Sequence, residues 1–396
     1  MRVSNSMLAR ISNAALMKRQ EDIISVQSQI ASGTKIQKPS DDPIGSAQKI
    51  DHETAISQLD QYNRNITVGQ SRLESAEVSI GSITDALQRA RELALTAANA
   101  TNSSNEHRAM ASELTQIRGD LFAIANGRDS SGNFLFSGTE IKTQPFTGNT
   151  NITYNGNSES RTVQARNNLL IETSFSGADV FLNIPRSTSS HSVNGNTANT
   201  GTAVLLLDGQ DSTGNTTTYS LEFTAADTYQ ILNADDGSVV VPPTPTPASG
   251  EINFNGLLVT VDGQAEAGDS FALPPSGNQD VFSTFQNFID ALNSSVDSPS
   301  GKAKLRQAVN ETLTAVDSAL DSFNTQRSLI GTRLQTMDTV KNENDFTTYQ
   351  LQESLSDVKD TNLTEAITRL QQHTLALQVL QQTTVRTQSL SLFNMT

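Results

Sequence analysis

The side chains that could carry out proton transfer or bind metals are scattered along this chain. Its four histidines, His52, His107, His191 and His373, lie far apart, and none belongs to an HExxH motif. Cysteine is absent, which excludes disulfides, thiolate zinc sites and thiol nucleophiles. Neither a glycine-rich phosphate loop nor a GxSxG elbow occurs. The sequence therefore predicts no enzyme, no cofactor and no catalytic or metal site.

Two groups of carboxylates suggest chemistry at first sight. Asp41 and Asp42 precede Pro43, which is the pattern of a helix N-cap followed by proline at the first helical position. We therefore expect Asp42 to cap a helix. The segment 208–211 (Asp-Gly-Gln-Asp) weakly resembles a calcium loop but lacks the later bidentate Glu, so a turn is expected.

The composition favours long helices over a compact catalytic domain. The chain has 396 residues, a length typical of two or three domains, yet only 35% are hydrophobic, 5% are aromatic and none is Trp. Helices that pack through narrow Leu, Ile and Ala seams need fewer apolar residues than a globular enzyme of this size. Composition alone therefore indicates an extended helical protein.

The negative charge is concentrated in the middle of the chain. The net charge is −15, and residues 139–280 contain fifteen acidic against four basic side chains. Nucleic acids and anionic membranes are bound by Lys and Arg surfaces, so neither is an expected partner. Met1 to Gln20 has no continuous apolar run, and no 18-residue apolar stretch occurs. We expect neither a cleaved signal peptide nor membrane insertion.

Apolar residues recur at alternating steps of three and four in both halves of the chain, which predicts long helices. Ser103 and Glu106 form a predicted capping box at the start of a second helix. A third helix is expected from about Lys302, although Arg327 interrupts its apolar stripe. The strongest pattern runs from Leu59 to Ala97 and consists of Leu59, Tyr62, Ile66, Gly69, Leu73, Ala76, Ile80, Ile83, Leu87, Ala90, Ala94 and Ala97.

The two ends of the chain are apolar along one side and carry mainly neutral polar residues elsewhere. An exposed helix normally carries Lys and Glu on its outer face, so such ends indicate helices surrounded by other protein. A few apolar side chains cannot hold long isolated helices in water. We therefore predict that both arms are disordered in the monomer and fold when neighbouring copies cover them. The expected assembly interface comprises Val3, Met7, Leu8, Ile11, Leu16, Ile23, Ile30, Leu363, Ile367, Leu370, Leu377, Leu380, Leu390, Leu392 and Phe393.

Between the helical halves the pattern changes to short strands. Residues 152–154, 202–207, 219–223 and 256–261 read as strands bounded by turn residues. The proline-rich run 241–247 is expected to be an extended surface loop. The predicted fold class is mainly α with a β insertion, in which the long terminal helices form a coiled-coil-like bundle and the centre forms a mostly-β variable domain.

This organisation gives three expected parts. The terminal helical arms are residues 1–33 and 360–396. The helical bundle comprises 34–138 and 282–359. The β-rich outer domain is 139–281.

Several motifs resemble the bacterial flagellin family. Residues 29–36 (Gln-Ile-Ala-Ser-Gly-Thr-Lys-Ile), followed by Asp41-Asp42-Pro43 and Ala47, are similar to the flagellin N-terminal signature. The opening Met1-Arg2-Val3-Ser4-Asn5, the stretch 132–139 (Gly-Asn-Phe-Leu-Phe-Ser-Gly-Thr) and the ending Leu390-Ser391-Leu392-Phe393 resemble the family members at the hook–filament junction more closely. The C-terminal Asn394-Met395-Thr396 departs from the more apolar ending of the family. The resemblance covers about residues 1–146 and 282–396.

The resemblance implies a structural adaptor that is exported through the flagellar type III channel without a cleaved signal. It further implies a flagellar export chaperone that holds the C-terminal helix. The implied partners are other copies of the chain in a ring, the first hook-associated junction protein and flagellin. The implied location is the hook–filament junction of a secreted flagellum, where the terminal arms would form an inner tube.

Three other readings remain open. The chain could be a flagellin filament subunit, although the Phe-Leu-Phe-Ser-Gly-Thr stretch and the Arg-Val-Ser opening favour the junction proteins. The β domain could act as an adhesin that binds glycan or host protein. An inserted hydrolase is disfavoured because the chain lacks catalytic residues.

Overall fold

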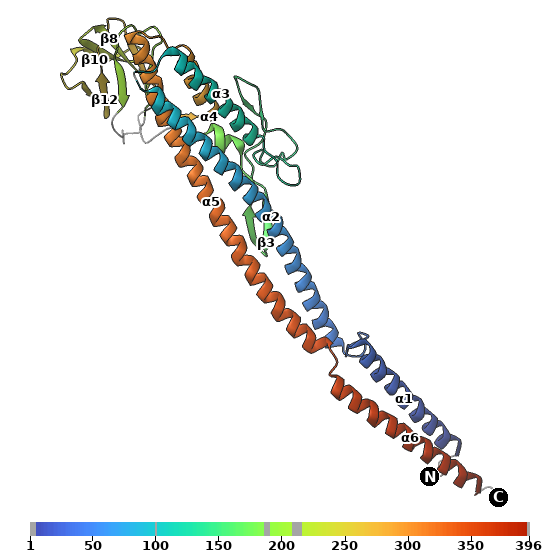
Figure 1. Ribbon diagram of the computed structural model, residues 1–396. Helices are drawn as coiled ribbons and strands as arrows, with labels where there is room; N and C mark the ends of the chain where they lie inside the picture. The colour runs from blue at the N-terminus through green and yellow to red at the C-terminus, as the bar shows by residue number, and fades with distance from the viewer. Residues whose placement is uncertain (1–4, 100, 186–190, 208–215, 394–396) are drawn as a thin grey trace. The chain divides into compact units, whose positions relative to one another are not determined.

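The structure, a computed structural model, describes residues 5–99, 101–185, 191–207 and 216–393 (Figure 1). The chain forms two compact units. The first unit combines Met1–Arg64 with Thr339–Thr396, and the second comprises Asn65–Asp338. Long helices at both ends and an antiparallel β domain in the middle confirm the predicted fold class. The three-part division expected from the sequence stays a prediction.

Six α-helices supply most of the described structure. Both ends of the chain contribute to the first unit, whereas the second unit is one continuous segment. In the part of the chain that the structure describes, no helix is long and apolar enough to cross a membrane. The helices are α1 (Asn5–Ser32), α2 (Pro43–Ala97), α3 (Ser104–Ala125), α4 (Val281–Asn293), α5 (Pro299–Lys359) and α6 (Leu363–Phe393).

The predicted seam of α2 is buried as expected, apart from its first member. Leu59 is partly exposed, whereas every later seam position is buried. Ile66, Leu73 and Ile80 have no exposed surface. The helix begins at Pro43, well before the strongest part of the pattern. This start is the one that the Asp42–Pro43 pattern predicts, and the apolar seam predicts the core face of the same helix.

Short-range capping sets the ends of the helices that pack beside α2. Ser103 and Glu106 form the predicted capping box of α3, with hydrogen bonds in both directions. Asp280 caps α4, because its Oδ1 accepts the Phe282 N–H at 2.8 Å.

Arg327, which interrupts the apolar stripe of α5, is exposed and pairs with Glu77 of α2 at 2.7 Å. The apolar stripe of α5 therefore includes a charged side chain that stays exposed to solvent and paired with a carboxylate.

The Gly132–Thr139 stretch supplies part of an aromatic core in the second unit. Phe136 is fully buried, and its ring lies edge-to-face with Phe181 at 5.2 Å between centroids. Phe146 contacts Phe181 at 5.3 Å and Phe282 of α4 at 5.5 Å. Aromatic pairs at such distances add about 0.5–1.5 kcal/mol beyond the area they bury. These rings join the segment after α3 to α4.

Short β elements and one π-helical turn follow this stretch. Two of the hairpins, β1–β2 and β3–β4, are antiparallel. The elements are β1 (Phe146–Thr147), β2 (Thr153–Tyr154), β3 (Thr162–Arg166), β4 (Leu169–Glu172), η1 (Ala178–Leu182), β5 (Ile184–Pro185) and β14 (Asn278–Gln279).

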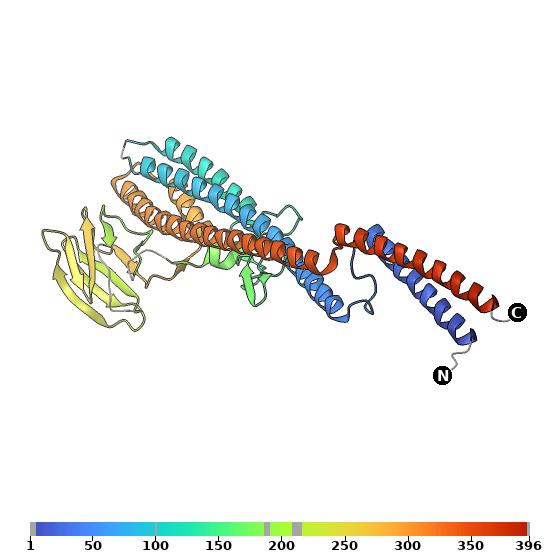
Figure 2. The ribbon, with the colours of Figure 1, turned by 90° about the horizontal axis from the view of Figure 1, so that it is seen from below.

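Two antiparallel sheets form the β domain (Figure 2). The five-stranded sheet has the order β10-β9-β8-β13-β6, and the three-stranded sheet has the order β11-β12-β7. Buried residues from both sheets, including Leu221, Ile231 and Val259, form one hydrophobic cluster. The strands are β6 (Asn194–Gly195), β7 (Val204–Leu207), β8 (Tyr219–Ala225), β9 (Thr228–Asn233), β10 (Val239–Pro245), β11 (Glu251–Phe254), β12 (Leu257–Asp262) and β13 (Ser270–Leu273).

The proline-rich run corrects one expectation. Residues 239–245 form β10, an edge strand paired with β9, where the sequence predicted a loop. Proline lacks the N–H that a central strand needs, but an edge strand has one side free of pairing. The register between β10 and β9 shifts twice between Val239 and Thr244, so Pro242 and Pro243 have no partner residue in β9.

Polar contacts attach the β domain to the first turns of α5. Leu205 donates its N–H to Gln307 Oε1 at 3.0 Å, and Lys304 Nζ donates to the Thr197 carbonyl at 2.6 Å. Arg306 pairs with Asp262. The acidic β domain therefore meets α5 partly through two of the helix's basic residues.

Candidate assembly interface

The two arms, α1 and α6, lie side by side in the first unit and run antiparallel (Figure 1). Helix α1 ends at Ser32, and Gly33 follows with φ +71°. Glycine is favoured in this left-handed conformation, which commonly ends helices. Asn362 caps the N-terminal end of α6, because its Oδ1 accepts the Thr364 N–H at 3.1 Å.

Backbone hydrogen bonds join the segments beside the two arms. Lys35 N–H donates to the Lys359 carbonyl at 2.7 Å, and Thr361 N–H donates to the Gly33 carbonyl at 3.0 Å. This short antiparallel bridge fixes the C-terminal end of α1 beside the N-terminal end of α6. Leu363 and Ile367 therefore lie at the opposite end of the helix pair from Met7 and Ile11.

The loop between α1 and α2 is held by its carboxylates. Asp42 Oδ1 accepts the Gly45 N–H at 3.0 Å, which is the hydrogen bond expected of an N-cap to α2. Asp41 Oδ2 accepts the Lys38 N–H at 3.0 Å. A Cβ at Gly45 would lie 2.6 Å from Asp42 Oδ2 and 2.7 Å from Ile36 Cδ1. The acidic pair of the signature thus organises a turn, and the glycine leaves room for it.

The seam between the arms buries little. Only Val26 of α1 and Ala366 of α6 are buried there among the described side chains. Six of the predicted interface residues are partly exposed and follow the two helices: Leu16, Ile23, Ile30, Leu370, Leu377 and Leu380. Two helices with so few buried residues gain too little to offset the ordering of their backbones.

A polar group crosses the seam near its middle. Arg19 Nη1 lies 3.2 Å from His373 Nδ1 and 3.3 Å from Asp22 Oδ2. The His373 ring is 3.9 Å from the same carboxylate. These contacts join α1 to α6 at a single register, because sliding either helix by one turn would separate them. His373 therefore contributes to packing between the arms.

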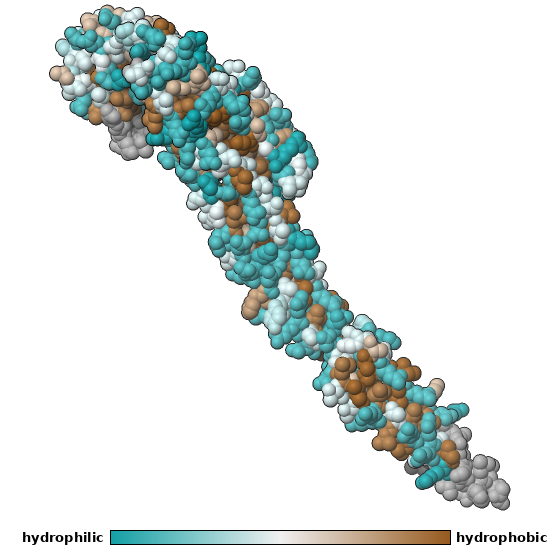
Figure 3. Space-filling model, in the orientation of Figure 1, coloured by the Kyte–Doolittle hydropathy of each residue, from teal (hydrophilic) through white to brown (hydrophobic). Residues whose placement is uncertain are grey.

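Figure 3 shows hydrophobic patches among hydrophilic residues on the visible face of the arms. Four predicted interface residues are largely exposed: Met7 (57%), Ile11 (58%), Leu363 (53%) and Ile367 (47%). Five more exposed apolar residues belong to the same helices and were not predicted: Met17, Ile24, Leu375, Val379 and Val385. Sequence reasoning assigned one seam to each arm, and these residues lie off it. Val3 and the side chains of Leu8, Leu390, Leu392 and Phe393 lie outside the described residues.

The predicted assembly interface stays a prediction, and the exposed apolar residues of the arms are the observation from which it can be proposed. Large apolar surfaces on soluble proteins mark places where another molecule binds. Within the described residues no group of three or more His, Cys, Asp or Glu side chains could hold a metal ion. The segment 208–211, which weakly resembles a calcium loop, lies outside the described residues. The arrangement can bury apolar helices against other helices.

The chain combines long helices from both ends with a β domain between them, and parts of it match models from one class of proteins, those of the bacterial flagellum. Residues 3–141 match the bacterial flagellin N-terminal helical region. Residues 194–275 match the D2-like domain of flagellar hook-associated protein 1.

Particular relatives within this class are hook-associated proteins. FlgL from Xanthomonas campestris has 29% identity and a TM-score of 0.71, covering 77% of this chain and 99% of that chain. Flagellar hook-associated protein 3 from Legionella pneumophila has 26% identity and a TM-score of 0.72, covering 78% and 98%. Flagellar hook-associated protein 3 from Salmonella typhimurium is 28% identical over 184 residues, which are 46% of this chain and 58% of that protein. These matches confirm the resemblance drawn from the motifs, which is to hook-associated protein 3 in the flagellin family.

Proposed function

We propose that this chain is a structural adaptor of the bacterial flagellum that joins the hook to the flagellin filament. In this role α1 and α6 polymerise with the arms of neighbouring copies in a ring. The partners on the two sides are the first hook-associated junction protein and flagellin. A flagellar export chaperone covers the C-terminal helix before export, and the chain performs no catalysis.

The exposed apolar surface of the arms carries this proposal. Leu375 and Val379 are 63% and 52% exposed on α6, and Met17 and Ile24 are 69% and 65% exposed on α1. Each fully buried Leu, Ile or Met side chain stabilises an assembly by about 1.5–3 kcal/mol. The names of the relatives, which include hook-associated protein 3 and the flagellar junction protein FlgL, support the hook–filament junction as the place of assembly.

Replacement of one exposed arm residue tests the proposal. Leu375→Asp would place a charge in the assembled interface at a cost of several kcal/mol, while leaving the monomer folded. We expect cells that carry it to have hooks without filaments and to release flagellin into the medium. Leu375→Met keeps an apolar side chain of similar size at the same position, so it is the matched control and should preserve filaments. Normal filaments with Leu375→Asp would contradict the proposal.

A deletion separates the adaptor from the flagellin reading. Loss of an adaptor should leave hooks intact and prevent flagellin from accumulating on them. Labelled protein should appear in electron micrographs as a short band where hook and filament meet. Label along the whole filament would instead identify a filament subunit.

A further inference from the structure

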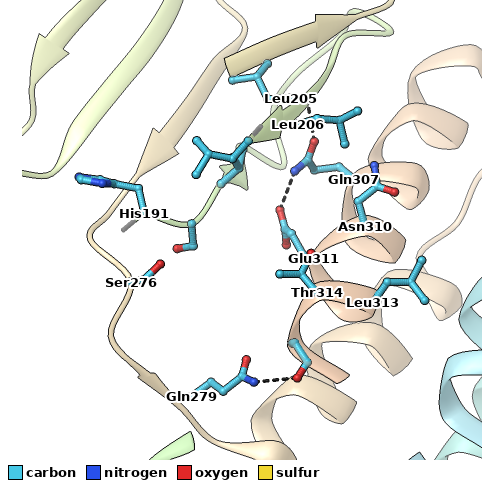
Figure 4. A pocket seen from close by; sticks show the side chains of 14 residues that line it. His191, Leu205, Leu206, Ser276, Gln279, Gln307, Asn310, Glu311, Leu313 and Thr314 are labelled. Atoms are coloured by element: carbon cyan, nitrogen blue, oxygen red, sulfur yellow. Dashed lines mark hydrogen bonds between the residues drawn. The ribbon is translucent and has the colours of Figure 1, made fainter. Parts of the chain in front are cut away.

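A cavity of about 360 Å³ lies between β7 and α5 in the second unit (Figure 4). Leu206 of β7 and Leu313 of α5 supply apolar lining, whereas Ser276 and Asn310 supply polar lining. The cavity lies beside a protein backbone as well as side chains, because β7 forms one of its walls. A ligand in this cavity would therefore lie against the backbone of β7 as well as against side chains.

The edge of β7 that faces α5 is not covered by another strand. β7 pairs with β12 on one side only, with Leu207 opposite Val259 and Leu205 opposite Val261. Leu205 donates its N–H away from β12, to Gln307 Oε1 at 3.0 Å. Backbone groups of an antiparallel strand alternate between its two sides, so the Leu207 N–H and C=O face the same way. Within the described residues neither has a hydrogen-bond partner.

A buried amide oxygen also points to a missing ligand. Gln279 is 4% exposed and lines the cavity, and Figure 4 shows its side chain entering from the side opposite β7. Its Nε2 donates to the Ala315 carbonyl at 2.7 Å, which fixes the orientation of the amide. Its Oε1 has no partner among the described residues. Leaving such a group unsatisfied costs about 1–3 kcal/mol, so a donor from a ligand would be favoured.

We propose that this cavity binds an extended peptide segment of a neighbouring protein chain, which adds to the free edge of β7 as a further strand. The segment exchanges backbone hydrogen bonds with Leu207, and one of its donors reaches Gln279 Oε1. At about 3.3 Å per residue, the four residues of β7 match a segment of about three or four residues. Strand addition of this kind takes affinity from the main chain and specificity from alternate side chains.

Charge restricts the composition of this segment. Residues 139–280 carry fifteen acidic against four basic side chains. A segment with basic residues is therefore attracted to this domain, whereas an acidic one is repelled. Apolar residues facing Leu206 and Leu313 would be buried. The partner segment is thus an extended, apolar and basic peptide.

A pair of capped peptides tests the proposal on the full chain as a monomer, so the result does not depend on assembly through the arms. The probe is acetyl-Val-Lys-Val-methylamide. The matched control ligand is the same peptide with a methyl group on the backbone amide nitrogen of the lysine. We expect the probe to bind with Kd below roughly 1 mM and to shift the amide signal of ¹⁵N-labelled Leu207. The methylated peptide has lost a strand hydrogen bond and should bind about tenfold more weakly.

Two variants show where the peptide binds. Thr314→Trp fills the cavity from the exposed face of α5 and should abolish binding, whereas Thr325→Trp, at an exposed position of α5 outside the cavity, should preserve it. Equal affinity for the two peptides, or unchanged binding by Thr314→Trp, would overturn the proposal. If both variants unfold at the same temperature as the natural chain, a loss of peptide binding is not caused by a loss of folding.

Discussion

At the scale of single residues, two glycines of α2 have opposite surroundings. A Cβ at Gly69 would lie 2.8 Å from Met337 Cε and 3.1 Å from both Val163 Cγ2 and Thr173 Cγ2. A Cβ at Gly81 would meet no atom within 4 Å. The first glycine therefore permits close packing of α5 and the β3–β4 hairpin against α2, whereas the second only weakens the helix.

Alanine at each position should separate these two roles. We expect Gly69→Ala to lower the free energy of unfolding by about 1–2 kcal/mol, because its neighbours must move. Gly81→Ala should raise it by about 0.5–1 kcal/mol through helix propensity. Urea unfolding of the two variants measures both effects. Stabilisation by Gly69→Ala would show that the packing there is loose.

The capping box of α3 gives a pH dependence. Hydrogen bonds from the Ser103 backbone at 2.6 Å and its hydroxyl at 2.9 Å lower the pKa of Glu106 below its ordinary 4.5. A carboxylate with a lowered pKa stabilises the fold above the ordinary value, and this contribution is lost as pH falls through the lowered pKa. We expect the first turn of α3 to lose amide-exchange protection below about pH 4.5.

Glu106→Gln provides the control for this pH effect. Glutamine retains a side-chain oxygen that can accept from Ser103 N–H but does not titrate. Hydrogen exchange of the Glu106 amide, followed by NMR from pH 6 to pH 3, should show an acid-induced loss in the natural chain alone. An equal loss in the variant would assign the effect to other carboxylates.

Sequence reasoning succeeded where the interaction is local and failed where the partner is distant. Ser103 and Glu106 are three residues apart, so their capping box could be predicted from spacing alone. The apolar pattern placed Gly69 on the core face of its helix, but it gave no sign that Val163 and Thr173 would lie close to this glycine. Gln279 gave no signal in the sequence, because its importance comes from burial beside Ala315.

At the scale of elements, helices were easier to predict than strands. The seam of α2 repeats over many turns, so single exceptions do not obscure it, and the Arg327 exception in α5 is explained by Glu77. Strand β10 was missed because prolines normally indicate a loop. Only its neighbour β9 and its position at the sheet edge make a proline-rich strand possible.

The prolines of β10 should protect the edge of the sheet from pairing with another molecule. Edge strands expose unpaired backbone groups, and proline interrupts such pairing. We therefore expect the double variant Pro242→Val, Pro243→Val to aggregate faster at high concentration with little change in monomer stability. Light scattering and sedimentation velocity measure this. Pro247→Val, which lies beyond the end of β10, is the control and should remain monomeric.

At the scale of the whole molecule, the arms differ from the second unit in how their stability arises. In the second unit, Ile66 and Leu73 are fully buried within a single chain. In the arm pair, Val26 and Ala366 are the buried apolar residues among the described side chains, and large residues such as Leu375 and Val385 are exposed. We therefore expect the arms to depend on other chains for most of their stabilisation.

Hydrogen exchange as a function of assembly tests this dependence. In dilute monomer, amides of 5–32 and 363–393 should exchange within seconds to minutes, whereas those of α2 from Asn65 to Ala97 should be protected. Assembly should protect the arms, because neighbouring copies cover their apolar faces and offset the entropy of ordering them. Leu375→Asp should keep the arms fast-exchanging under assembly conditions, and Leu375→Met should behave like the natural chain. Strong arm protection in the dilute monomer would show that α1 and α6 are stable as an isolated pair, and the stabilising role of neighbouring copies would then be wrong.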